Sequence, residues 1–284
     1  MISLDVAKVE ETNTTGFAET NAVTIVGFYG TAKPPALHGL VSAVSAHVQD
    51  SLKDYPGLFC AYPIAQVHAT LMGIEGHIEG DSIVLDNART RALRFGVPAR
   101  PFDVAGLLSF LRQHPWPLRC RFGGHAPIDR NPYDPGHPPW GRTFDVQPNG
   151  LAVLMGWPCS HDGAPFAPGL LGLRKALEAY GAIHKYHIDP AGQDNDLFLR
   201  LGGISAQAWR ELAKTGQAEA ALTALVEARD QVRQSLLAHP TVVDIELRDL
   251  SVVRYRCTTL ARVAFCESLT SLAAGALTAQ YECT

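Results

Sequence analysis

A histidine and a threonine lie two residues apart in the segment Gln66–Gly73, QVHATLMG, whose other residues are mostly apolar. If this segment is a strand, His68 and Thr70 share one face, because successive side chains point to opposite faces. An imidazole can take up or release a proton near neutral pH, and a neighbouring hydroxyl can hydrogen-bond to an anionic substrate. The spacing therefore predicts a strand with one buried face and one face that carries chemistry.

The rest of the chain predicts strand, helix, strand units in both halves. β-Branched and aromatic runs bounded by glycine or proline favour strands, and apolar residues three or four apart favour helices. Asp103 and Ser205 suit helix N-caps. The strands are expected at 23–30, 66–73, 117–124, 150–158, 196–203, 241–247 and 250–259, and the helices at 37–52, 103–113, 169–183 and 205–238 with a weak point at Gly216.

Two segments stand outside this pattern. Residues 1–20 are polar and weakly patterned, so we expect a flexible N-terminal segment followed by one two-lobed domain over 21–284. Residues 125–150 are rich in proline, which predicts an irregular insertion near 125–150. Long loops in compact domains are often functional, so this one is interpreted as a flap over a central cleft, with a purely structural excursion as the alternative.

The order of elements predicts a two-lobed α+β fold with a central cleft. Taken with this order, His68-Ala69-Thr70-Leu71 resembles the His-x-Thr-x motif of the 2H phosphoesterases. That family includes RNA 2′,3′-cyclic phosphodiesterases and the 2′-5′ RNA ligase-like proteins. The resemblance extends over roughly residues 21 to 260 and implies two pseudo-symmetric antiparallel sheets with flanking helices.

The resemblance implies two such motifs, one from each lobe, with one histidine acting as a base and the other as an acid. This chain departs from the pattern, because the strand of the second motif carries Asp196 and Phe198 at the corresponding positions. His184 and His187 lie shortly before that strand. The second motif is therefore degenerate, and the resemblance leaves His187 or Asp196 as the partner of His68.

The predicted function is metal-independent hydrolysis of a phosphodiester, 2′,3′-cyclic or 2′-5′, in a nucleotide or an RNA end. His68, Thr70, His187 and Asp196 are the expected catalytic residues, and Tyr29, His184, Tyr255 and Arg256 the expected substrate-binding residues. The alternative is a non-catalytic relative that binds a nucleotide, an RNA end or a protein. A structural, hydrogen-bonded His68 and a solvated turn around Asp194 also stay open.

Imidazole and carboxylate groups together could hold a metal, but the H-x-x-H spacing of His184 and His187 is no known metal signature, so no metal or cofactor is expected. The six cysteines are scattered and no secretory signal follows Met1, which indicates a cytoplasmic protein with reduced thiols. A net charge of −4 argues against bulk DNA binding. The chain also contains no apolar run long enough to span a membrane.

Overall fold

The apolar runs pair as antiparallel strands in a ten-stranded sheet of the computed structural model, which describes residues 4–15 and 22–282. The order along the sheet is β10-β6-β8-β9-β3-β1-β11-β12, with β2 added to β9 and β7 added to β8. The strands of the sheet are β1 (Ala22–Gly27), β2 (Phe59–Ala61), β3 (Ala69–Gly73), β6 (Leu118–Phe122), β7 (Phe144–Val146), β8 (Leu151–Pro158), β9 (Leu197–Ile204), β10 (Thr241–Ile245), β11 (Leu250–Tyr255) and β12 (Val263–Ser268). The fold is therefore α+β, with a large antiparallel sheet flanked by helices.

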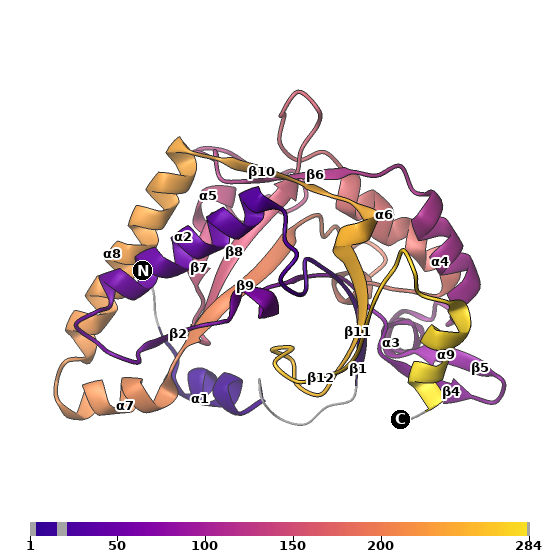
Figure 1. The fold of residues 1–284 in the computed structure, drawn as a ribbon, viewed down its shortest axis with the longest axis horizontal. Coiled ribbons are helices and arrows are strands. Elements are labelled where there is room, and N and C mark those ends of the chain that lie inside the picture. Colours follow the sequence, from indigo (N-terminus) through magenta and orange to yellow (C-terminus); the bar gives the residue numbers. More distant parts are fainter. Residues whose placement is uncertain (1–3, 16–21, 283–284) are drawn as a thin grey trace.

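Helices gather at both ends of the sheet (Figure 1). At one end lie α1 (Val6–Thr15), α2 (Pro35–Ser51), α7 (Ala206–Lys214) and α8 (Ala218–Ala238); at the other lie α3 (Asp86–Phe95), α4 (Val104–Gln113), α6 (Gly169–Leu177), α9 (Ala274–Glu282) and the hairpin of β4 (Gly76–Glu79) and β5 (Ser82–Leu85). The short helices are α5 (Pro139–Thr143), η1 (Ile64–Gln66), η2 (Glu178–Tyr180), η3 (Lys185–His187) and η4 (Leu247–Asp249).

The sheet divides into two sets of four strands, β12-β11-β1-β3 and β10-β6-β8-β9. They meet where β3 pairs with β9, and the pairing there is a single residue pair, Ala69 with Leu199. Every residue of β1 and of β8 is buried, which explains why both strands are largely apolar in the sequence. We refer to these two sets of strands, which share one continuous sheet, as the two lobes.

Local sequence signals explain the helix ends. The Asp103 side chain accepts a hydrogen bond from the Gly106 backbone N–H, and Ser205 accepts one from Ala208, so both predicted N-caps are confirmed. The expected weak point at Gly216 separates α7 from α8, and this glycine has a φ of 72°, which L side chains rarely adopt. One predicted helical stretch is therefore two helices.

The N-terminal residues differ from the prediction of a flexible segment over 1–20. Residues 6–15 form α1, Val9 is fully buried, and the Asn13 side chain donates to the Ile204 carbonyl. One buried valine and one amide give too weak a periodic pattern to predict this helix. Residues 1–3 and 16–21 lie outside the described residues.

The proline-rich 125–150 segment is only partly irregular. It contains α5, which begins at Pro139, and β7, which pairs with β8. Proline fits the first turn of a helix, so the density of prolines did not exclude this short one. Residues 125–138 form turns and one isolated bridge, between Asn131 and Asp134.

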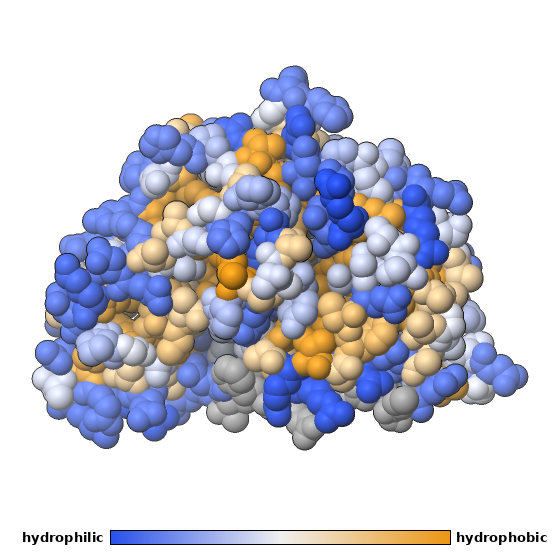
Figure 2. Space-filling model, in the orientation of Figure 1, coloured by the Kyte–Doolittle hydropathy of each residue, from blue (hydrophilic) through white to orange (hydrophobic). Residues whose placement is uncertain are grey.

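The surface shows no dominant apolar face in the view of Figure 2, where hydrophobic residues form several separate patches among hydrophilic ones. Leu93, 80% exposed, and Ile128, 76% exposed, are the most exposed large hydrophobic side chains of the described residues. Within the same ranges, no helix combines the length and the apolar character needed to cross a membrane.

Candidate functional site

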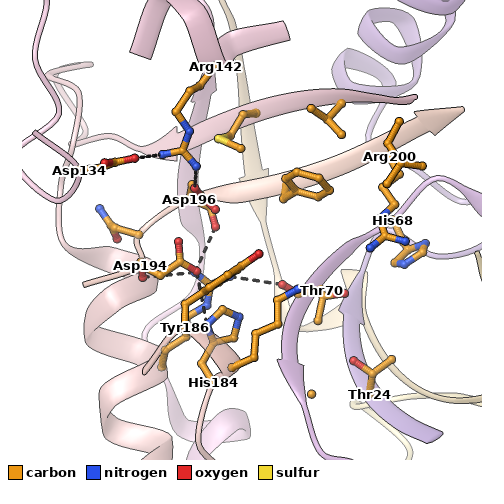
Figure 3. A pocket seen from close by; sticks show the side chains of 18 of the residues that line it. Thr24, His68, Thr70, Asp134, Arg142, His184, Tyr186, Asp194, Asp196 and Arg200 are labelled. Carbon is orange, nitrogen blue, oxygen red and sulfur yellow. Dashed lines mark hydrogen bonds and ion pairs between the residues drawn. The ribbon is translucent and has the colours of Figure 1, made fainter. Parts of the chain in front are cut away.

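A cavity of about 900 Å³ lies where the two lobes meet, and this size suits a nucleotide-sized ligand (Figure 3). The β3 and β9 motif strands and the 125–150 segment all contribute to its lining. From the motif strands and the residues just before them come His68, Thr70, Asp194, Asn195, Asp196, Phe198 and Arg200, and from the 125–150 segment come Asn131, Tyr133, Asp134, Arg142, Asp145, Gln147 and Asn149. The cavity is thus predominantly polar and charged near the motif strands.

The β3–β9 pairing places corresponding residues of the two lobes around one point. His68 directly precedes β3, as Asp196 directly precedes β9, so the two residues occupy equivalent positions. Extending the Ala69–Leu199 pairing by one residue in each direction puts Thr70 opposite Phe198 and His68 opposite Arg200. The polar residues His68 and Thr70 therefore face Arg200 and Phe198 of β9.

His68 is neutral and presents one ring nitrogen to the cavity. Its Nδ1 lies 2.7 Å from the Gln66 carbonyl oxygen, which only accepts, so Nδ1 carries the hydrogen and Nε2 keeps a lone pair. Burial, followed by the positive charges of Arg200 and Lys33, lowers the pKa of His68 to about 4. At neutral pH this imidazole is thus unprotonated and can accept a proton.

Thr70 and Arg200 line the cavity together with His68. The Thr70 side chain is exposed to the cavity, and Arg200 is half-buried beside His68 (Figure 3). Within residues 4–15 and 22–282, neither the Arg200 guanidinium nor the Thr70 hydroxyl forms a hydrogen bond or ion pair with another side chain or the backbone. A hydroxyl, a guanidinium and an imidazole in this position suit a phosphate group.

If the cavity binds a phosphate group, replacing Arg200 by methionine is expected to weaken that binding about 10- to 100-fold, because a hydrogen bond to a charged group contributes about 1.5–3 kcal/mol. Isothermal titration would measure this loss. Arg94→Met is the matched control, since Arg94 is exposed and lies outside the cavity lining. Equal losses in the two variants would contradict the assignment of Arg200.

Across the cavity from His68 lie two carboxylates, Asp194 and Asp196, with Thr70 between the two sides (Figure 3). Arg142 Nη2 lies 2.7 Å from Asp196 Oδ2, and Arg174 Nη1 lies 2.9 Å from Asp194 Oδ2. Burial and the neighbouring Asp196 raise the pKa of Asp194 to about 7, although Arg174 opposes the shift. The carboxylate pair therefore retains a proton close to neutral pH.

Arg174 ties the two motifs together from α6. Its side chain is 2% exposed, its Nη1 also donates to the Asp196 carbonyl, and its Nε and Nη2 donate to the carbonyls of Leu71 and Thr70. One guanidinium thus bonds the backbone of β3 and the chain leading into β9. Arg174 therefore links β3, the strand that follows His68, to the segment that carries Asp194 and Asp196.

The two histidines before β9 have different places. His184 lines the cavity, with Nδ1 3.4 Å from Asp194 Oδ2, and burial and Arg174 lower its pKa strongly. His187 is fully buried outside the cavity lining, and its Nε2 accepts a hydrogen bond from the Asp194 backbone N–H. The structure therefore brings His184 to the site, while His187 supports the backbone at Asp194.

Only some of the expected substrate-binding residues line the cavity. Tyr255 lines the cavity and donates a hydrogen bond to Glu75 Oε1 at 3.0 Å, and burial and Glu75 raise its pKa. Tyr29 stands behind the site, with its ring edge-on to His68 at 6.2 Å between centroids and its hydroxyl donating to the Leu260 carbonyl. Arg256 is exposed and lies outside the cavity lining.

Three arginines that line the cavity were not predicted from the sequence: Arg142, Arg174 and Arg200. The spacing of Asp194 and Asp196 was a usable signal, because side chains two apart on an extended chain share a face. Among the described residues, no group of three or more His, Cys, Asp or Glu side chains is placed to hold a metal ion.

Comparisons with known proteins found similar solved structures. A conserved protein of unknown function from Agrobacterium tumefaciens strain C58 is 13% identical, with a TM-score of 0.39, over 86% of this chain and 84% of that one. A protein of Thermus thermophilus is also 13% identical, with a TM-score of 0.35, over 87% of this chain and 97% of that one. No family model matches the sequence, and no curated protein matches it.

Proposed function

We propose that the protein hydrolyses a 2′,3′-cyclic or 2′-5′ phosphodiester in a nucleotide or an RNA end. The observation that carries this proposal is the convergence of His68 Nε2, the Thr70 hydroxyl and the Arg200 guanidinium, all without internal partners among the described residues, on one cavity. The cavity is large enough for a nucleotide, and His68 is neutral at physiological pH. Attack of water on a phosphodiester requires at least a base that takes a proton from the water and a site that binds the phosphate anion.

The reaction is one in-line displacement. His68 Nε2 takes a proton from the attacking water, whose oxygen bonds to phosphorus, while Thr70 and Arg200 neutralise charge on the non-bridging oxygens. The bond from phosphorus to the leaving ribose oxygen breaks, and that oxygen takes a proton from the Asp194–Asp196 pair. The product is a phosphate monoester with a free hydroxyl, and the enzyme returns to its starting state by moving one proton from His68 to the carboxylate pair.

The carboxylate pair replaces the second histidine in this scheme. His187 cannot serve, because its Nε2 accepts from the Asp194 backbone and its Nδ1 is buried. Asp194 retains a proton near neutral pH, as a general acid must. The scheme therefore gives Asp196 the role of partner to Asp194.

The dependence of kcat/KM on pH tests this scheme. His68 must be neutral, so the rate is expected to rise as pH increases through about 4; Asp194 must be protonated, so the rate is expected to fall as pH increases through about 7. The expected profile is a bell with its plateau on the acidic side of neutrality. A rate that keeps rising through pH 8 would show that the carboxylate pair is not the acid.

A further inference from the structure

The cavity has a second polar end, further along β3 than Thr70, which the hydrolysis scheme does not use. Among the residues that line this end are Gly73, Glu75, Tyr186 and Tyr255. The register of β3 against β1 shifts between Thr70 and Met72, and this bulge lets Thr70 and Gly73 both face the cavity although they are three residues apart. The floor of the cavity therefore runs without interruption from the phosphate-binding group to Glu75.

Glu75 holds a carboxylate in a fixed place at this end. Its Oε1 accepts a hydrogen bond from the Tyr255 hydroxyl at 3.0 Å. The carboxylate lies back over Gly73, since a Cβ on Gly73 would stand only 2.4 Å from Glu75 Oε2. A side chain at position 73 would displace this carboxylate, so the glycine and the tyrosine together define its position.

The chemistry of this carboxylate decides which ligand group suits it. An ionised carboxyl group only accepts hydrogen bonds and has about four positions for them, of which Tyr255 uses one. Among the common nucleobases, guanine alone presents two neighbouring donors on its pairing edge, N1–H and the N2 amino group. Two parallel N–H groups match the two oxygens of a carboxylate, as they do in an arginine–carboxylate pair.

Tyr186 supplies an aromatic ring on which a base can stack. It is 60% exposed, and its ring projects into the cavity in Figure 3. Lys185 Nζ lies 4.7 Å from the centroid of this ring, and the His184 ring lies 5.5 Å from it. Stacking on an aromatic side chain strengthens the binding of every base. Tyr186 therefore suits affinity for a base, and Glu75 suits the choice between bases.

We propose that this end of the cavity is a base subsite that selects guanine, with Glu75 accepting hydrogen bonds from N1–H and the N2 amino group while Tyr186 stacks on the ring. The inference rests on the proposed function for the kind of ligand, a nucleotide whose phosphate lies at Thr70 and Arg200. The carboxylate lies over Gly73, three residues from Thr70, which is roughly 10 Å along an extended strand. A ribose and a purine base together span such a distance.

The test is isothermal titration of the full chain with the 2′- and 3′-monophosphates of guanosine, inosine and adenosine. Inosine lacks only the N2 amino group, and adenosine lacks N1–H as well. We expect the guanosine nucleotide to bind about 10-fold more tightly than the inosine nucleotide and about 100-fold more tightly than the adenosine nucleotide, the range for hydrogen bonds to a charged acceptor. The titrations are run at pH 8, because burial raises the pKa of Glu75 and only the ionised carboxylate accepts both hydrogen bonds.

Two variants assign the two roles. Glu75→Gln keeps an oxygen for the Tyr255 hydroxyl but turns an amide N–H₂ toward the guanine donors, so guanosine affinity should fall about 10- to 100-fold while adenosine affinity hardly changes. Tyr186→Ala should weaken all three nucleotides by a similar factor. Glu79→Gln is the matched control, because Glu79 is exposed on the neighbouring β4 and lies outside the cavity lining.

The wild-type comparison alone can overturn the inference, whether or not Glu75→Gln folds. Equal affinities for the three nucleotides, or binding of none of them, would do so, as would a guanine preference that survives in a folded Glu75→Gln. These titrations require no turnover. A guanine preference in a protein that hydrolyses no phosphodiester would therefore keep the subsite and refute the hydrolysis, and turnover without any base preference would refute the subsite alone.

Discussion

His68→Asn is expected to lower the turnover of a 2′,3′-cyclic nucleotide about 10²- to 10⁴-fold, the contribution of one general base. Asparagine can keep the hydrogen bond that His68 Nδ1 donates to the Gln66 carbonyl, but it supplies no basic nitrogen in place of Nε2. Loss of rate without loss of folding is thus the expected result. Steady-state kinetics and a thermal melt on the same preparation measure both.

His68→Ala is the companion variant and removes that hydrogen bond as well, which is expected to cost about 1 kcal/mol of stability. His38→Ala is the control, since His38 is exposed on α2. If the rate fell only in proportion to the unfolded fraction, His68 would be a structural residue and the base would have to be sought elsewhere.

Arg174→Met is expected to reduce the free energy of unfolding by about 3–5 kcal/mol, because it leaves a buried carboxylate without its cation. The variant leaves Asp194 without the guanidinium that pairs with it. It also removes the hydrogen bonds that Arg174 donates to the carbonyls of Thr70, Leu71 and Asp196. Urea titration of the variant and of the exposed-site control Arg94→Met measures the difference.

The loss of unfolding free energy in Arg174→Met should also depend on pH. The pKa of Asp194 is already raised in the folded protein, and a carboxyl of this kind costs stability once it must ionise. Without Arg174 the pKa rises further, so the deficit is expected to grow as pH increases through 7 and beyond. A deficit below about 1 kcal/mol at every pH would show that Arg174 is not the tie between the lobes.

The sequence predicts the parts of the fold that depend on local pattern. The apolar runs that became β1 and β8 are fully buried, and the caps at Asp103 and Ser205 form as expected. Elements with weak patterns were not predicted, among them β4, β5, α3, β12 and α9. Such short or amphipathic pieces are placed by tertiary contacts more than by their own periodicity.

The site was predictable where it follows from alternation along one strand. Thr70 faces the cavity and His68 precedes it on the same side, as the QVHATLMG pattern predicts. Arg200 was not predictable in this way, because its position beside His68 depends on the β3–β9 pairing between lobes. Asp194 lies in a run of turn-forming residues, and only the burial supplied by Arg174 and His184 sets it apart from a solvated turn.

The most direct test of the account is the rate of phosphodiester hydrolysis by the wild-type full chain, with EDTA present to silence contaminating metal-dependent phosphatases. The panel comprises 2′,3′-cyclic nucleotides, 2′-5′-linked dinucleotides and, as a comparison, their 3′-5′-linked counterparts. We predict turnover of a cyclic or 2′-5′ substrate at about pH 5 to 6 that falls about 10²- to 10⁴-fold in His68→Asn while phosphate binding persists. Absence of turnover across the panel, in a protein that still binds a nucleoside monophosphate through Arg200, would contradict the catalytic assignment and leave a binding protein.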